Sequence, residues 1–129
     1  MNHKKYIETD NAPKALGTYS QAVMAHDTLY VSGQIAIDPQ TNQLITGTFS
    51  QRAHCVFQNI SAIVRAAGMD LDDVVKLNIS LTNLDDFSDL NKVMSDYFHA
   101  PYPARACVQV AALPKNTDIE IEAICVRSS

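Results

Sequence analysis

The stretch PYPARACVQVAALPKNTDIEIEAICV, residues 101–126, decides how the C-terminal half of the chain folds. Apolar residues alternate over about 105–111 and 118–126, which predicts two β-strands joined by the turn at residues 113–116. The two strands carry one arginine and two glutamates in an otherwise apolar frame. Charged side chains in such a frame need a partner or a functional role, so this stretch holds the main candidates for a functional site.

Strand geometry indicates which of these side chains lie together. Side chains alternate across a strand, so Arg105, Cys107 and Gln109 share one face. Glu120 and Glu122 share one face of the last strand by the same rule. The short turn favours an antiparallel pairing of the two strands, and we therefore expect Arg105 to lie close to one of the glutamates.

The spacing alone leaves two interpretations of this cluster open. One is a structural ion pair at a sheet edge or an interface. The other is an anion pocket, in which the planar fork of Arg105 binds a carboxylate and a glutamate holds or deprotonates water. Cys107 is a candidate nucleophile, but no histidine or lysine stands at an informative spacing, which favours a small buried side chain. By pattern alone, Tyr19, Ser32 and Asn91 are packing, surface or capping residues.

The rest of the chain predicts two helices and several further strands. Apolar residues at three- and four-residue spacing predict a helix from Phe49 to Ala67, and Thr48 with Gln51 forms the sequence of a capping box. Gly68 is a plausible helix end. A second helix is expected over about 84–98. Strand patterns cover 19–25, 28–37 and 74–81, a short return strand is expected over 43–46, and residues 1–13 read as an arm or a short edge strand.

This order of elements predicts the fold class. We expect an α+β two-layer sandwich, in which a mixed sheet of about six strands carries two helices on one face, within a single domain spanning residues 1–129. Gly33, inside a strand pattern, suggests a bulge or a close backbone approach. The second sheet face is partly apolar at Tyr30, Ala36, Ile124 and Val126, which predicts that subunits associate through it.

Composition excludes several functional classes. The formal net charge is −4 and no run of Lys or Arg occurs, which argues against nucleic acid as a partner. There is no apolar signal-peptide region or membrane-length apolar run, so we expect a cytoplasmic protein without a membrane partner. Three cysteines without a C-x-x-C spacing and four scattered histidines argue against a disulfide scaffold and against a metal site.

Several motifs resemble those of one known family. They include Pro103-Ala104-Arg105-Ala106-Cys107-Val108-Gln109-Val110-Ala111-Ala112-Leu113-Pro114-Lys115, followed by Ile119-Glu120-Ile121-Glu122-Ala123-Ile124, and earlier Asn11-Ala12-Pro13, Tyr19-Ser20-Gln21, Ser32-Gly33-Gln34, Ala66-Ala67-Gly68, Asp86-Phe87 and Asn91. Over nearly its whole length the sequence resembles the RidA family, the reactive enamine/imine deaminases. The resemblance implies a chorismate-mutase-like fold and a homotrimer with pockets at the subunit interfaces.

The resemblance also implies an activity. Family members hydrolyse 2-aminoacrylate, 2-aminocrotonate and their imine tautomers, which pyridoxal-phosphate-dependent dehydratases release, to 2-keto acids and ammonia without a cofactor or metal. It assigns substrate-carboxylate binding to Arg105 and pocket roles to Tyr19, Ser32, Asn91, Cys107 and Glu120. Chemically, Glu120 suits orientation of the attacking water and transfer of its proton. Glu122 is assigned to structure.

Two other functions remain as alternatives. Some relatives are described as endoribonucleases or translation inhibitors, but the acidic charge counts against RNA binding. A non-catalytic module that binds small acids or acts as a chaperone-like holdase is the other. Thr18 stands where family members commonly have proline, which frees φ at that residue and predicts a looser loop around Tyr19 and an altered substrate preference.

Overall fold

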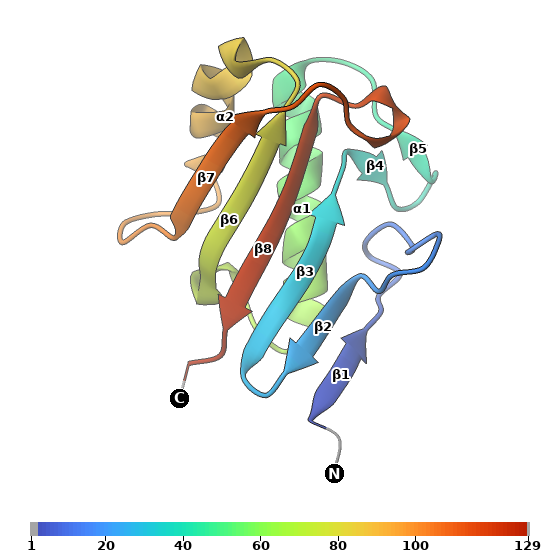
Figure 1. Cartoon of the computed structure of the whole chain (residues 1–129), viewed down its shortest axis with the longest axis vertical. Coiled ribbons are helices and arrows are strands. Elements are labelled where there is room, and N and C mark those ends of the chain that lie inside the picture. The colour runs from blue at the N-terminus through green and yellow to red at the C-terminus, as the bar shows by residue number, and fades with distance from the viewer. Residues whose placement is uncertain (1–2, 129) are drawn as a thin grey trace.

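A six-stranded sheet with two helices on one face forms the two layers of the structure, a computed structural model that describes residues 3–128 (Figure 1). The predicted α+β two-layer sandwich with a mixed sheet is confirmed. The strands are β1 Lys4–Ile7, β2 Ala22–Ala25, β3 Thr28–Gln34, β4 Ile37–Asp38, β5 Gln43–Leu44, β6 Val74–Leu81, β7 Ala104–Gln109 and β8 Ile119–Val126, and the α-helices are α1 Phe49–Ala66 and α2 Phe87–Met94. Short 3-10 turns cover Leu71–Asp73, Leu84–Asp86 and Pro114–Asn116.

The strand order of the large sheet is β1-β2-β3-β8-β6-β7. Neighbouring strands are antiparallel except β6 and β7, which are parallel and are connected through α2. The prediction that β7 and β8 pair with each other is wrong, because β6 lies between them. The connection over residues 110–118 is longer than a tight hairpin loop, and it lets the chain pass over one strand.

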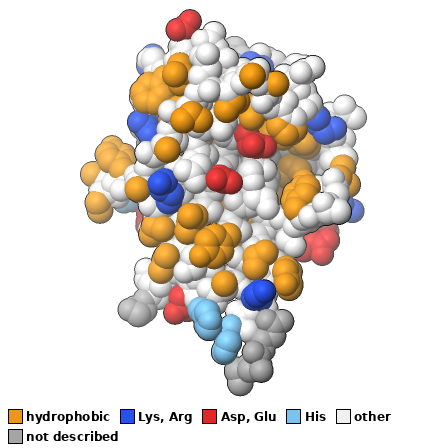
Figure 2. All heavy atoms as spheres, in the orientation of Figure 1, with side chains coloured by type: hydrophobic (Ala, Val, Ile, Leu, Met, Phe, Trp, Pro, Cys, Tyr) orange, Lys and Arg blue, Asp and Glu red, His pale blue; other side chains and the backbone are white. Residues whose placement is uncertain are grey.

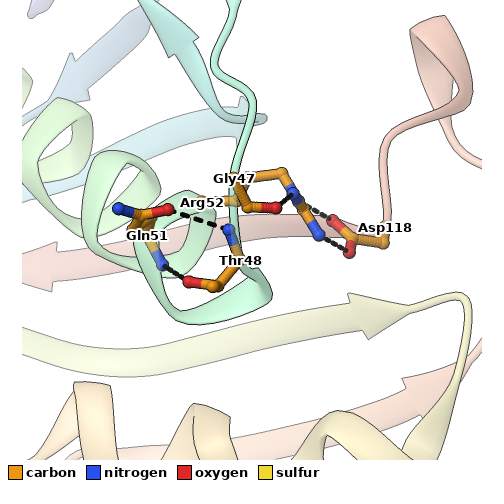
Figure 3. Close-up of polar contacts among 5 residues, drawn as sticks. All are labelled: Gly47, Thr48, Gln51, Arg52 and Asp118. Atoms are coloured by element: carbon orange, nitrogen blue, oxygen red, sulfur yellow. Dashed lines mark hydrogen bonds and ion pairs between the residues drawn. The ribbon is translucent and has the colours of Figure 1, made fainter.

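Helix α1 begins where the sequence predicts. The Thr48 hydroxyl accepts from the backbone N–H of Gln51, and the Gln51 side chain accepts from the backbone N–H of Thr48, which completes the capping box (Figure 3). The helix ends before Gly68, whose φ of +79° lies in the left-handed region that favours glycine. The buried residues of α1 share one face, which packs on the sheet: Phe49, Ala53, Cys55, Val56, Phe57, Asn59, Ile60, Ile63 and Val64.

The second helix is shorter than predicted. It starts at Phe87, after a 3-10 turn in which the Asn83 side chain accepts from the N–H of Asp85, and it ends at Met94. After Met94 the N–H groups of Asp96 and Tyr97 bond to carbonyls three residues back, so the chain continues as turns. Of the range 84–98 predicted as a helix, only Phe87–Met94 is α-helical, and the flanking residues form a 3-10 turn and further turns.

Strand β3 changes the face it presents to the helices at a bulge. Leu29 and Val31 are buried toward the helices, and the register to β8 then shifts between Val31 and Gln34. Beyond the shift Gln34 and Ala36 are buried. The prediction that Ala36 lies on the second sheet face is wrong, because the bulge reverses which residues point toward the helices. The bulge suggested by Gly33 is confirmed.

The open face of the sheet, opposite the helices, combines apolar side chains with carboxylates. Tyr30 is 52% exposed and Val126 is 40% exposed on this face. Figure 2 shows apolar patches on this side of the molecule, with acidic side chains near its middle. Among residues 3–128, each helix is too short or too polar to cross a membrane.

Candidate functional site

Arg105 lies on β7, the edge strand, on the side of the sheet that faces the helices. Its register partner on β6 is Leu77, which in turn pairs with Ala123 on β8, and both of these are buried under the helices. Because directly paired residues share a face, the arginine points toward α2. A cavity of about 360 Å³ lies there. It is lined by Asn91, Met94, Ser95, Tyr102, Pro103 and Arg105.

Neutral groups hold the Arg105 guanidinium. One Nη donates to Oδ1 of Asn91 at 2.6 Å and lies 3.7 Å from the Met94 sulfur. The guanidinium carbon lies 5.0 Å from the ring centroid of Phe87, in cation–π geometry. Among the residues that the structure describes, Arg105 forms no ion pair with a carboxylate. Its charge and most of its donors are therefore available to an anion.

Glu120 lies on β8, on the open face of the sheet, in a second cavity of about 440 Å³. This cavity is lined by Pro13, Lys14, Leu16, Tyr19, Ser32, Gly33, Gln34, Ile35, Ile37, Asn42, Pro114, Lys115, Glu120 and Glu122. Gly33 gives the carboxyl its space, because a Cβ at that position would stand 2.9 Å from Cδ of Glu120. The close approach expected at Gly33 is thus present, and the group that approaches is the candidate catalytic side chain.

The surroundings of Glu120 favour its protonated form. Burial is the main cause that raises the pKa of the Glu120 carboxyl, and the negative charge of Glu122 adds to it. Glu122 itself accepts a hydrogen bond of 3.1 Å from the Asn78 side-chain amide. A carboxyl whose pKa lies above its ordinary range exchanges protons closer to neutral pH, which is the property that a general acid or base needs.

Two further candidates line the same cavity. The Ser32 hydroxyl donates to the Ser20 carbonyl at 2.6 Å, so its oxygen lone pairs remain available as acceptors. Tyr19 is 54% exposed and stands in the loop before β2. The structure therefore brings Tyr19 and Ser32 together with Glu120, and it brings Asn91 together with Arg105.

These two groups of residues lie apart in one chain. Arg105 and Glu120 are on opposite faces of the sheet, on strands separated by β6. The expectation that they lie close together is wrong for the single chain, because β8 pairs with β3 and β6 instead of with β7. No described hydrogen bond or ion pair joins Arg105 to either glutamate, which removes the intrachain ion pair as an explanation.

Cys107 shares the face of Arg105 but lines neither cavity. It is half-buried against the core, and burial raises the pKa of its thiol, while the charge of Arg105 lowers that pKa by a smaller amount. A thiol with a raised pKa is a poor nucleophile at neutral pH. Within residues 3–128 there is also no cluster of three His, Cys, Asp or Glu side chains that would hold a metal ion.

Sequence reasoning missed several residues of both cavities. Phe87 falls within the helix predicted over about 84–98, and nothing in its spacing distinguishes a core ring from one that stacks on a guanidinium. Lys14 and Lys115 line the Glu120 cavity from loops, where periodicity carries no information. Tyr102 lies between the predicted second helix and the predicted strand at about 105–111, where no periodic pattern marks it as a site residue.

Comparisons with known proteins connect this geometry to a family. The family model described as Endoribonuclease L-PSP matches residues 9–127. A 2-iminobutanoate/2-iminopropanoate deaminase of Dermatophagoides farinae is 46% identical over 126 residues, which cover 98% of this chain and 98% of that protein. The crystal structure of RidA from Psychrobacter sp. PAMC 21119 superimposes with a TM-score of 0.92 at 54% identity, covering 95% of this chain and 99% of that chain.

A further solved structure contains a small molecule. The E. coli protein TdcF with bound serine superimposes with a TM-score of 0.92 at 44% identity, covering 96% of this chain and 99% of that chain. The family model covers residues 9–127, which is nearly the whole chain. The chain belongs to the Endoribonuclease L-PSP family, the RidA family that its sequence resembles.

Proposed function

We propose that this protein is a cofactor-independent deaminase that hydrolyses reactive 2-enamine and 2-imino acids to 2-keto acids and ammonia. The observation that carries the proposal is the guanidinium of Arg105, which faces a cavity and is held by neutral groups. Such a group suits the carboxylate that every 2-imino acid carries. Relatives named 2-iminobutanoate/2-iminopropanoate deaminase, at 46% and 47% identity over nearly the whole chain, support the choice of substrate class.

In the proposed reaction, Arg105 binds the substrate carboxylate and thereby fixes the position of the imine carbon. Glu120, in its ionised form, accepts a proton from water, and the oxygen of that water adds to the protonated imine carbon to give a carbinolamine. Glu120 then returns this proton to the amine, the C–N bond breaks as the carbonyl forms, and the hydroxyl proton leaves with the ammonia, which releases the 2-keto acid. Tyr19 and Ser32, which line the same cavity as Glu120, would hydrogen-bond the intermediate, and the backbone near Cys107 is a further candidate.

A site that uses both Arg105 and Glu120 requires more than one chain, because the two lie on opposite faces of the sheet. The proposal therefore includes a homotrimer with its pockets at subunit interfaces, where Arg105 of one subunit meets Glu120 of the next. The exposed apolar residues on the open face, Tyr30, Val108 and Val126 among them, support burial of this face in an assembly. We further propose that the protein acts in the cytoplasm, where dehydratases that use pyridoxal phosphate supply the substrate.

The test couples this protein to a threonine dehydratase and measures the rate of 2-keto acid release. We expect the wild type to accelerate release and Arg105→Ala to lose about 100-fold in kcat/KM, the effect of removing about 3 kcal/mol of charge-assisted hydrogen bonding. Arg65→Ala, an exposed arginine on α1 outside both cavities, is the matched control. Full activity in Arg105→Ala would contradict the proposed role of Arg105.

Mixing of two inactive variants tests whether the site is shared. Equal amounts of Arg105→Ala and Glu120→Gln, unfolded together and refolded, should recover activity at about a quarter of the sites if each site takes one residue from each of two chains. Light scattering on the same samples reports the oligomeric state. A monomer, or no recovery after mixing, would contradict the interfacial site. RNA cleavage by the wild type that is lost in Arg105→Ala would instead favour the endoribonuclease alternative.

A further inference from the structure

Arg52, on the first turn of α1, makes three hydrogen bonds, two to Asp118, 66 residues along the chain, and one to Gly47, just before the helix (Figure 3). Its Nε donates to Oδ1 of Asp118 at 2.9 Å, and one Nη donates to Oδ2 of the same carboxylate at 2.7 Å. The other Nη donates to the carbonyl of Gly47 at 2.7 Å. The bidentate pair is mostly shielded from water, since the two side chains are only 22% and 24% exposed. Such a geometry fixes the relative orientation of the two groups as well as their distance.

These bonds connect the segments that form the walls of the Glu120 cavity. Gly47 follows the β4–β5 hairpin, from which Ile37 and Asn42 line the cavity. Asp118 follows the Pro114–Asn116 turn, from which Pro114 and Lys115 line it. One guanidinium therefore connects residues that directly follow two segments, each of which contributes to the lining of the Glu120 cavity.

Asp118 also fixes where β8 begins. Its carbonyl accepts from the backbone N–H of Thr82, at the end of β6, at 3.2 Å, and Glu120 follows two residues later. The preceding turn holds Lys115 and Asn116 at φ of 57° and 56°, a left-handed conformation that residues other than glycine adopt rarely. Without its anchor at Asp118 this turn would be free to relax, and the start of β8 would move with it.

We propose that Arg52 is a positioning residue for catalysis, whose pairing with Asp118 holds the Glu120 carboxyl at its place in the cavity. The inference rests on the proposed function for its kinetic consequence. Arg52 touches neither cavity, and it acts through the backbone between Asp118 and Glu120. A plain structural ion pair would stabilise the fold and leave the catalytic rate of folded molecules unchanged.

The charges around the pair indicate what its removal does. Burial is the main cause that raises the pKa of the Asp86 carboxyl, just before α2. The negative charge of Asp118 raises this pKa further, and the positive charge of Arg52 lowers it. Loss of the Arg52 charge would remove the cation that offsets the repulsion between the Asp86 and Asp118 carboxylates. Reversal of the pair, with Arg52→Glu and Asp118→Arg together, restores an ion pair between α1 and the start of β8, although a glutamate at position 52 cannot donate to the Gly47 carbonyl.

The experiment compares Arg52→Gln, Asp118→Asn and the reversed pair, with Arg65→Gln on the same helix as the control. For folded, assembled protein we expect Arg52→Gln and Asp118→Asn each to lower kcat about tenfold, as displacement of a catalytic group by a fraction of an ångström does. KM should stay within about twofold, because the carboxylate-binding Arg105 lies on the other face. The reversed pair should recover most of the lost kcat.

A second readout does not depend on activity. Carbon-13 NMR of labelled glutamate follows the titration of Glu120, whose raised pKa is caused by burial and by Glu122 and has no direct contribution from Arg52 or Asp118. A fall in the Glu120 midpoint in the single variants, and its return in the reversed pair, would therefore report movement of the carboxyl. Variants that keep the wild-type kcat and midpoint while losing thermal stability would overturn the inference. If the wild type shows no deaminase activity, the proposed function fails and the titration alone decides the inference.

Discussion

Arg52 and Arg105 are two arginines with the same charge and opposite surroundings. Arg52 is paired with the Asp118 carboxylate and the Gly47 carbonyl, so its donors are occupied within the chain. Arg105 is held by a side-chain amide, a sulfur and an aromatic ring, none of which neutralises its charge. The first arrangement stabilises a junction between segments, and the second holds a cation in place while keeping it able to bind an external anion.

The comparison explains why the partner of each arginine matters more than its exposure. A carboxylate partner neutralises the guanidinium and occupies two of its donors, so a second carboxylate gains less by binding the same group. A neutral partner orients the fork through one hydrogen bond and leaves the electrostatic attraction intact. Exchange of a neutral partner for a charged one should therefore convert one kind of arginine into the other.

Among changes that leave Arg105 itself in place, the largest expected effect comes from making that exchange at Asn91. In Asn91→Asp the new carboxylate would accept the same 2.6 Å hydrogen bond from Arg105 and add an opposite charge. We expect KM for 2-imino acids to rise about tenfold or more, since a charge-assisted bond of at least 1.4 kcal/mol would have to be displaced. Steady-state kinetics in the coupled dehydratase assay measures the change, and thermal unfolding should show no loss of stability.

Asn91→Ala is the matched control for this prediction. It removes the orienting hydrogen bond without neutralising Arg105, so its KM should rise less than that of Asn91→Asp. Equal kinetic constants in Asn91→Asp and the wild type would show that the neutrality of this partner has no bearing on substrate binding.

A second prediction separates the constant charge of Arg105 from the variable charge of Glu120. Arginine stays protonated over the accessible pH range, so the acid limb of kcat should come from Glu120, which must lose its proton to act as a base. Because Glu122 contributes to the raised pKa of Glu120, Glu122→Gln should lower that pKa and move the acid limb to lower pH. Glutamine can still accept the hydrogen bond from Asn78, so the local geometry is kept.

The pH profile of kcat checks this prediction, with Glu122→Asp as the control that keeps the charge. The sign follows from the form that acts: a lower pKa leaves more of Glu120 ionised at any acidic pH, so the variant should retain more of its maximal rate there than the wild type does. An acid limb that moves to higher pH, or that stays in place in Glu122→Gln, would contradict the assignment of this limb to Glu120.

The contrast between the two arginines also shows what sequence could predict. Local periodicity identified α1 with its capping box, the β6 strand, and the shared face of Glu120 and Glu122, because each depends on neighbouring residues. The pairing of Arg52 with Asp118 could not be predicted, because the two residues lie 66 positions apart and no local pattern connects them. Local pattern likewise does not show that β6 lies between β7 and β8. The register of these strands places Arg105 and Glu120 on opposite faces.

Strand pattern alone made Arg105, Cys107 and the two glutamates candidates, whereas pocket roles for Tyr19, Ser32 and Asn91 came only from the resemblance. The motif around Arg105 and Glu120 is specific to the family, and it implied a pocket shared between subunits, which one chain's geometry alone would not suggest. The neighbours of these residues were not predictable from sequence. Gly33 suggested a close approach but not that Glu120 makes it, and the contact of Phe87 with Arg105 depends on tertiary packing.

The smallest expected effect tests the aromatic partner of Arg105. Phe87→Leu keeps an apolar side chain at the start of α2 but removes the ring that lies 5.0 Å from the guanidinium carbon. A cation–π contact at a partly exposed site contributes about 0.5–1 kcal/mol, so KM should rise about two- to fivefold with kcat nearly unchanged. Phe87→Tyr keeps the ring and should stay close to the wild type. If both variants raise KM equally, the ring acts through the packing of α2, and only Asn91 remains as a neutral partner of Arg105. A rise in KM in Phe87→Leu alone would establish that two neutral partners, Asn91 and Phe87, together hold Arg105 in place for its anion.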